Sequence, residues 1–186
     1  MATARRALVA LILSLFAGTL LAGCTGGGPA LPEQASCEEE HEVADGTTWL
    51  RILVARPLYA NELGLNRLWA KPTAIGLLRN ETGAQAFGEE LPGERKDWTL
   101  DQSLWYEGRV PSGDYNFIRI SVDGDIESRR TDGVEPEVIV RFGRLTITHP
   151  EPDHPIELPD GQCYTVLHEP VMTIQAQDRY EIADRA

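Results

Sequence analysis

The chain is short of positive charge. Its 186 residues include 29 Asp and Glu but only 17 Lys and Arg, and two of the basic residues are lysines, Lys71 and Lys96. The formal net charge is −12 at pH 7. An anionic partner such as DNA, RNA or an acidic lipid surface requires a basic footprint on the protein. We therefore expect no nucleic-acid partner, and a domain with a well-solvated acidic surface.

The chain also lacks the short motifs that mark common catalytic sites. It contains no Gly-x-Ser-x-Gly nucleophile elbow, phosphate-binding loop, His-Glu-x-x-His motif or Gly-x-Gly-x-x-Gly motif. Its four histidines fall in expected loops or at strand ends, and none is an evident partner for a serine. We therefore predict that the protein is not an enzyme, that it has no catalytic residues and that it needs no cofactor.

Helical periodicity is absent as well, and no internal repeat is visible. Short stretches rich in β-branched and aromatic residues recur instead, separated by turn-forming residues. The expected strands cover 47–55, 73–79, 84–87, 98–101, 105–110, 115–122, 138–142, 144–148, 162–167 and 171–176. Residues 59–68 are compatible with either a helical turn or a loop. The pattern predicts one all-β domain over 47–178, an immunoglobulin- or transthyretin-like antiparallel β-sandwich, followed by a charged tail that frays over 179–186.

The amino-terminal segment has the order of a secretory signal. Arg5 and Arg6 supply positive charge, residues 7–21 are almost entirely apolar, and the small residues Ala22 and Gly23 follow. The apolar run is shorter than the ~20 residues that a permanent membrane-spanning helix needs. We therefore expect residues 1–23 to be a signal peptide.

The stretch Leu21-Ala22-Gly23-Cys24 resembles the lipobox of bacterial lipoproteins. The resemblance implies a diacylglyceryl group on the Cys24 sulfur, cleavage before Cys24 and acylation of the new amino group, and two or more acyl chains anchor a protein stably. Residues 24–46 would then be a lipid anchor and a flexible acidic tether, with the membrane as partner through the lipid. Thr25 in place of Asp favours the outer membrane if the source is Gram-negative. An ordinary signal peptide with a chance cysteine, or an uncleaved anchor, remains the alternative.

The sequence contains three cysteines. If Cys24 carries lipid, Cys37 and Cys163 remain as an even pair near the two ends of the domain. In an exported protein such a pair is most simply a disulfide, although two separate thiols are the alternative. A loop of this length would restrict the unfolded chain by roughly 5 kcal/mol in the chain-entropy model.

The run from Val110 to Val122 combines a turn with a strand. In it, Pro111-Ser112-Gly113-Asp114 is turn chemistry, and Ile118, Ile120 and Val122 alternate toward one face while Tyr115, Phe117 and Arg119 take the other. The run resembles a family of bacterial and archaeal lipoproteins with a Pro-x-Gly-x-Tyr-x-x-Ile-Arg signature, a turn and strand also found in transthyretin-like sandwiches. The resemblance implies a sandwich in which Gly113 reverses the chain and Tyr115 packs over the turn as a corner. The family has no agreed activity.

Three groups of residues are candidates for ligand binding. The loop 149–157 gathers His149, His154 and three carboxylates, but its alternating prolines are expected to spread them apart, so we assign no metal site there. Asp123, Asp125 and Glu127 could begin a calcium loop, although they lack the spacing of an EF-hand. The four tryptophans could stack on a sugar if exposed on one face, whereas a buried set would be core; they are Trp49, Trp69, Trp98 and Trp105.

These observations favour a cell-envelope lipoprotein that acts as a non-enzymatic interaction or structural module, with an envelope protein as a candidate partner. A ligand-binding module for carbohydrate or calcium is the alternative.

Overall fold

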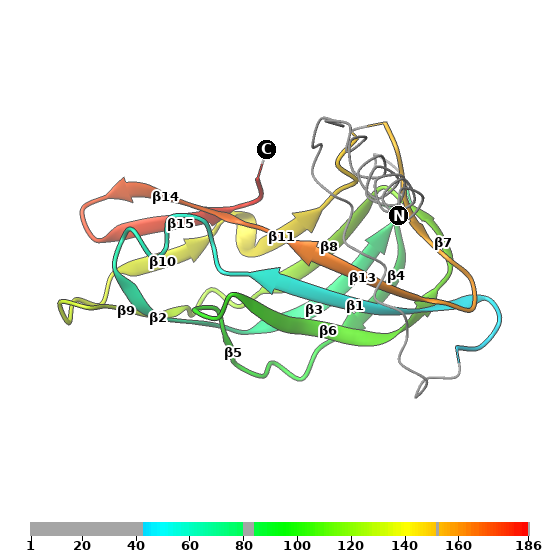
Figure 1. Cartoon of the computed structure of the whole chain (residues 1–186), viewed down its shortest axis with the longest axis horizontal. Helices are drawn as coiled ribbons and strands as arrows, with labels where there is room; N and C mark the ends of the chain where they lie inside the picture. The colour runs from blue at the N-terminus through cyan, green and yellow to red at the C-terminus, as the bar shows by residue number, and fades with distance from the viewer. Residues whose placement is uncertain (1–42, 80–83, 152, 186) are drawn as a thin grey trace, which may run out of the picture. The chain divides into compact units, whose positions relative to one another are not determined.

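The computed structural model describes residues 43–79, 84–151 and 153–185. Cys24, Cys37 and the expected leader and tether up to residue 42 lie outside the described residues. Within those ranges the chain forms fifteen β-strands and one short 3₁₀ turn (Figure 1). None of the helical structure found in them has the length and apolar character needed to cross a membrane. The strands are β1 (Thr47–Ala55), β2 (Leu65–Ala70), β3 (Pro72–Leu78), β4 (Gln85–Glu90), β5 (Lys96–Asp97), β6 (Gln102–Pro111), β7 (Gly113–Tyr115), β8 (Phe117–Val122), β9 (Glu127–Arg130), β10 (Glu137–Val140), β11 (Arg144–Ile147), β12 (Ile156–Leu158), β13 (Cys163–His168), β14 (Val171–Ala176) and β15 (Arg179–Ala183), with η1 (Arg141–Gly143) between β10 and β11.

The fold is an all-β sandwich, as the sequence predicts. One sheet has the order β13-β1-β6, and a four-stranded sheet has the order β11-β8-β3-β4 (Figure 1). Smaller sheets of order β10-β15-β14, β5-β2-β9 and β12-β7 extend this arrangement. Buried and partly exposed residues alternate along β1 and β8, so that each strand gives one face to a common apolar core. The core strands β1 and β8 supply Leu50, Ile52, Val54, Ile118 and Ile120, all fully buried.

Not every pair of strands is antiparallel. β1 runs antiparallel to β6 but parallel to β13, with Trp49 opposite Cys163. β10 and β15 are also parallel. The strictly antiparallel expectation is therefore wrong at these two pairs, because strands from the carboxyl-terminal part of the chain align with earlier ones through long crossover connections.

The turn after β6 forms the expected tyrosine corner. Gly113 has a φ of 126°, outside the range that other residues readily adopt. Tyr115 is fully buried, and its hydroxyl donates a hydrogen bond to the Pro111 carbonyl at 2.9 Å. The corner therefore closes on itself within five residues. Tyr115 does not share an exposed face with Phe117, as the alternation suggested, because it belongs to the separate strand β7.

Three local expectations are corrected. Residues 65–68, expected to lie in a helical turn or a loop, begin strand β2. Residues 98–101 form a turn before β6, in which the Trp98 indole N–H donates to the Ala55 carbonyl at 2.9 Å. The segment 179–186 does not fray as a whole, since β15 occupies Arg179–Ala183 and buries Tyr180 and Ile182 between charged neighbours.

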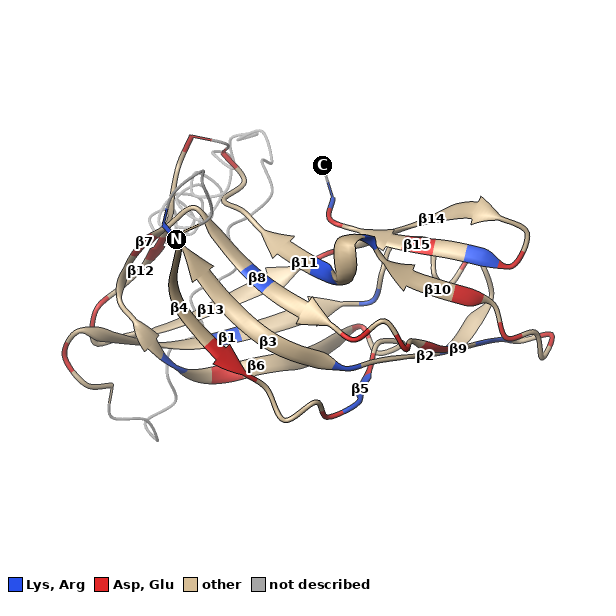
Figure 2. Ribbon diagram, turned by 180° about the vertical axis from the view of Figure 1, so that it is seen from behind, with Lys and Arg blue, Asp and Glu red and all other residues tan. Residues whose placement is uncertain are grey.

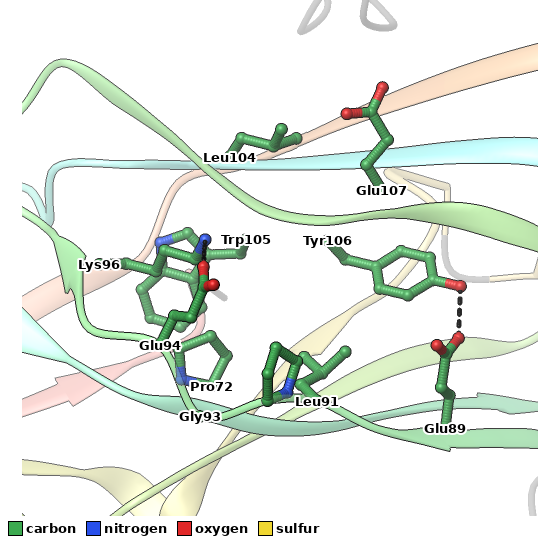
Figure 3. Close-up of a pocket in the computed structure, with 11 residues that line it drawn as sticks. Pro72, Glu89, Leu91, Gly93, Glu94, Lys96, Leu104, Trp105, Tyr106 and Glu107 are labelled. Atoms are coloured by element: carbon green, nitrogen blue, oxygen red, sulfur yellow. Dashed lines mark hydrogen bonds and ion pairs between the residues drawn. The ribbon is translucent and has the colours of Figure 1, made fainter.

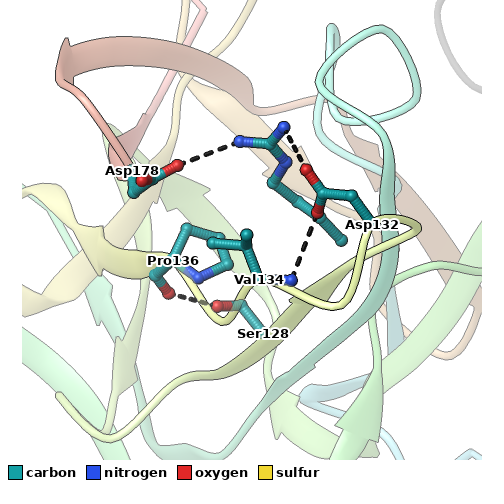
Figure 4. Close-up of polar contacts among 6 residues, drawn as sticks. Ser128, Asp132, Val134, Pro136 and Asp178 are labelled. Atoms are coloured by element: carbon teal, nitrogen blue, oxygen red, sulfur yellow. Dashed lines mark hydrogen bonds and ion pairs between the residues drawn. The ribbon is translucent and has the colours of Figure 1, made fainter.

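A single arginine ties two turns together at the β9–β10 end of the sandwich (Figure 4). The Arg130 guanidinium donates to Asp132 at 2.6 Å and to Asp178 at 2.9 Å. Asp132 also accepts from the Val134 backbone N–H at 3.2 Å. The Ser128 hydroxyl donates to the Pro136 carbonyl in the same turn. Exposed ion pairs contribute little singly, but this network fixes the β9–β10 loop against the β14–β15 turn.

Candidate functional site

Of the three cysteines in the predicted lipidation and disulfide sites, the structure describes Cys163. Cys24 and Cys37 lie outside the described residues. Cys163 begins β13 and is 9% exposed, beside the central strand β1. Lipidation of Cys24 and the Cys37–Cys163 disulfide therefore stay predictions.

The tryptophans do not form a stacking platform. Trp98 and Trp105 are buried and pack edge to face, with ring centroids 4.7 Å apart. Trp69 is 37% exposed on β2, and Trp49 is half-buried on β1, in a different sheet. A sugar cannot lie across all four rings, so any saccharide site must be built in another way.

The histidine-rich loop is more compact than its prolines suggest. His149 and His154 have ring centroids 5.5 Å apart, and Glu151 contacts both. Its backbone N–H donates to His149 Nδ1 at 3.1 Å, and its carboxylate lies 3.1 Å from His154 Nε2. The expectation that these side chains spread apart is wrong, because a turn returns the His154 N–H to the Glu151 carbonyl.

Two of the carboxylates considered as the start of a calcium loop instead lie beside cationic side chains. Both Glu127 carboxylate oxygens are used, one by Arg67 at 2.9 Å and the other by Arg95 at 2.6 Å. Asp123 accepts from the Asp125 backbone N–H at 3.3 Å and lies 3.9 Å from the Lys71 ammonium. Among the residues that the structure describes, no three or more His, Cys, Asp or Glu side chains are grouped to hold a metal ion.

A pocket of about 240 Å³ opens at the edge of the sandwich, between β4 of one sheet and β6 of the other (Figure 3). We call it the edge pocket. Its apolar wall consists of Trp105, Tyr106, Leu91, Pro92 and Pro72, and its polar groups come from Glu89, Glu94 and Lys96. Leu104 and Glu107 also line it, but their side chains point to the opposite side of β6 (Figure 3).

A β-bulge explains why two consecutive aromatic residues share this wall. In the pairing of β1 with β6, Ile52 faces Tyr106 while the next residue, Leu53, faces Leu104, so Trp105 is the extra residue. In a regular strand Trp105 and Tyr106 would point to opposite faces; the bulge turns both inward, where they are 3% and 4% exposed. The adjacent pair Trp105-Tyr106 is the sequence signal that could have revealed the bulge.

Tyr106 links the two sheets across the pocket. Its hydroxyl donates to a Glu89 carboxylate oxygen at 2.9 Å (Figure 3). Burial raises the pKa of Tyr106 above its ordinary 10.0, and the hydrogen bond and the negative charge of Glu89 act in the same direction. Tyr106 is therefore a neutral donor at physiological pH, and the second Glu89 carboxylate oxygen has no hydrogen-bond partner among the described residues.

The remaining polar groups present both donors and acceptors. The Lys96 ammonium lies 3.4 Å from Glu94, whose side chain is 70% exposed at the mouth. The Trp105 indole N–H is buried and has no hydrogen-bond partner among the described residues. A buried donor without a partner costs roughly 1–3 kcal/mol. The pocket therefore combines an apolar wall with the carboxylates of Glu89 and Glu94 and the ammonium of Lys96, which suits a small polar ligand with an apolar face.

Searches with the sequence and the structure matched no protein-family model, no curated protein and no solved structure.

Proposed function

We propose that the protein is a cell-envelope lipoprotein whose β-sandwich is a non-enzymatic binding module. The lipobox-like Leu21-Ala22-Gly23-Cys24 supports the anchor, and the Gly- and Pro-containing run after it supports a flexible tether. Lipid on Cys24 holds the domain at the membrane, and a Cys37–Cys163 disulfide closes the domain near its two ends. The acidic surface keeps the domain from binding an anionic lipid surface by charge.

The edge pocket supports binding of a small, hydroxyl-rich ligand with one apolar face, such as a single sugar ring. A volume of about 240 Å³ is below the ~300–1,000 Å³ typical of pockets for drug-sized molecules. The observation that carries the proposal is the bulge that turns Trp105 and Tyr106 into one wall opposite Glu89. Hydroxyl groups can donate to Glu89 and Glu94 and accept from Lys96, while ring C–H groups pack on the apolar wall.

A pair of adjacent glutamates provides a matched test of this pocket. Neutral and N-acetylated monosaccharides are titrated into the folded domain by isothermal titration calorimetry. We expect at least one to bind, and Glu89→Gln to weaken it about tenfold through loss of a charge-assisted hydrogen bond. Glu90→Gln is the control, because Glu90 lies on the opposite face of β4. The proposal is wrong if no saccharide binds, or if both variants change the affinity equally.

The anchor is tested separately. Cys24→Ala in the full chain, expressed in a bacterium with lipoprotein processing, should move the protein from the membrane fraction to the supernatant. Thr25→Ala serves as the control, since it changes the next residue but leaves the cysteine of the lipobox in place. Membrane retention of the Cys24 variant would contradict the lipoprotein assignment.

A further inference from the structure

A second hollow, of about 420 Å³, lies on the outer face of the four-stranded sheet β11-β8-β3-β4. We call it the sheet groove. Two rows of outward-facing residues cross the strands on this face of the sheet. Strand register places Arg144, Ser121, Ala74 and Glu90 in one row, and Thr146, Arg119, Gly76 and Gly88 in the next.

The side of the groove on β8 and β11 is cationic (Figure 2). Arg119 and Arg144 are diagonal neighbours on one face, since Arg144 pairs with Ser121 and Arg119 pairs with Thr146. Each guanidinium rests on an aromatic ring, Arg119 at 5.7 Å from the Phe117 centroid and Arg144 at 6.0 Å from that of Phe142. Stacking positions a guanidinium and leaves its in-plane N–H groups available to an oxyanion.

Neither guanidinium has a carboxylate partner among the described residues, although most arginines in them form ion pairs. The Arg119 Nε is buried there without a hydrogen-bond partner. In a chain with 29 acidic residues, two adjacent unpaired arginines stand out. They form a site with the donors for a carboxylate, which accepts bidentate bonds from arginine.

The middle of the groove is shallow-walled, because the β3 residues in its two outward-facing rows are Ala74 and Gly76, while Ile75 and Leu78, which also line it, are buried. Gly76 does not have a positive φ, and an added Cβ would meet no atom nearer than 3.8 Å. A methyl group would therefore fit at this position, in ordinary contact with the Gln85 side chain, which also lines the groove. A glycine inside a strand that is not needed for the backbone often marks a place where a ligand approaches closely.

The opposite side of the groove is anionic. Glu90 ends β4 and is exposed, and Figure 2 shows acidic ribbon at that end of β4. One strand, β3, separates β4 from β8, so their backbones are about 10 Å apart. Three extended residues span about 10 Å. A free tripeptide can therefore reach from one charged side to the other.

We propose that the sheet groove binds a short zwitterionic peptide that lies across the strands. Its terminal carboxylate binds Arg119 and Arg144, its ammonium group binds Glu90, and its backbone lies over Ala74 and Gly76. Glu89 lines both the sheet groove and the edge pocket, but the groove lies on the other face of β4 and the proposal does not depend on the function proposed for the pocket.

Trialanine, titrated into the folded domain and followed by calorimetry and amide chemical shifts, tests the proposal. We expect binding with shifts centred on β3 and β8, loss of binding for trialanine amide, and at least fivefold weaker binding for N-acetyltrialanine. Equal binding of all three peptides would overturn the proposal, and so would the absence of trialanine binding. If N-acetyltrialanine binds as well as trialanine while the amide does not bind, Glu90 does not bind the ammonium group and the zwitterion proposal fails.

Variants locate the site. Arg119→Gln and Arg144→Gln should each weaken trialanine binding at least tenfold, and Gly76→Val should abolish it by filling the floor. Arg129→Gln is the control, because Arg129 is an exposed arginine on β9, outside the groove. Lys96→Gln should leave trialanine binding unchanged, because Lys96 lines the edge pocket and does not line the sheet groove. If Arg129→Gln weakens trialanine binding as much as Arg119→Gln does, the assigned location is wrong.

Discussion

Replacing Gly76 with alanine should make the domain more stable. Gly76 lies within β3 without a positive φ, and the new Cβ would be 3.8 Å from Gln85 Cδ and the Phe87 carbonyl oxygen, which is ordinary van der Waals contact. Glycine in the middle of a strand costs about 0.5–1 kcal/mol relative to alanine, because the unfolded chain loses more freedom. We therefore expect the free energy of unfolding to rise by about 0.5–1 kcal/mol.

Urea unfolding followed by circular dichroism measures this change, and the melting temperature should rise by about 1–3 °C for a domain of this size. Gly93→Ala is a suitable control. The space around Gly93 is open, but its φ is +67°, so alanine there is strained and should destabilise the domain. If Gly76→Ala lowers the free energy of unfolding, the residue is required by the fold, and the space above it is not evidence of a ligand.

Three further predictions concern tyrosine and phenylalanine side chains. Because the pKa of Tyr106 is raised in the folded state, this side chain ionises first in the unfolded state as pH rises above 10.0. The free energy of unfolding, measured by urea titration, should therefore fall above that pH. The fall should be smaller in Tyr106→Phe, which lacks the ionisable hydroxyl. Tyr115→Phe removes the hydrogen bond to the Pro111 carbonyl and should cost about 1–2 kcal/mol in urea unfolding, whereas the exposed Tyr59→Phe should be neutral. Phe142 is 80% exposed and has a φ of 57°, a left-handed conformation that is strained for any residue with a Cβ. Phe142→Gly should therefore stabilise the domain by about 1 kcal/mol in thermal unfolding. A lower melting temperature for this variant would contradict the reasoning.

The strands could be predicted from the sequence where their pattern is local. Alternation in β1 and β8 is complete within each segment, and the corner formed by Pro111, Gly113 and Tyr115 is contained in five residues. The strand β15 was missed because its charged residues suggested a frayed tail, although Tyr180 and Ile182 alternate with them. In that segment burial of two side chains outweighs the charge of their neighbours.

The two candidate sites could not be predicted in the same way. The edge pocket depends on an extra residue, Trp105, whose effect appears only when β6 pairs with β1. The sheet groove depends on the register of four strands, which brings Gly76 between Arg119 and Gly88. Neither register follows from periodicity within a single strand.

The parallel pairing of β1 with β13 also has a consequence for how the chain folds. β1 is the central strand of its sheet. Its residue Trp49 lies opposite Cys163 of β13, and most of the domain lies between these two residues in sequence. Such long-range pairing slows folding, because a large loop must close before its contacts form. The first strand cannot complete its sheet until the chain is available through His168. We therefore expect the domain to fold after synthesis of nearly its whole length, so that an exported chain would remain unfolded during passage and fold on the far side of the membrane.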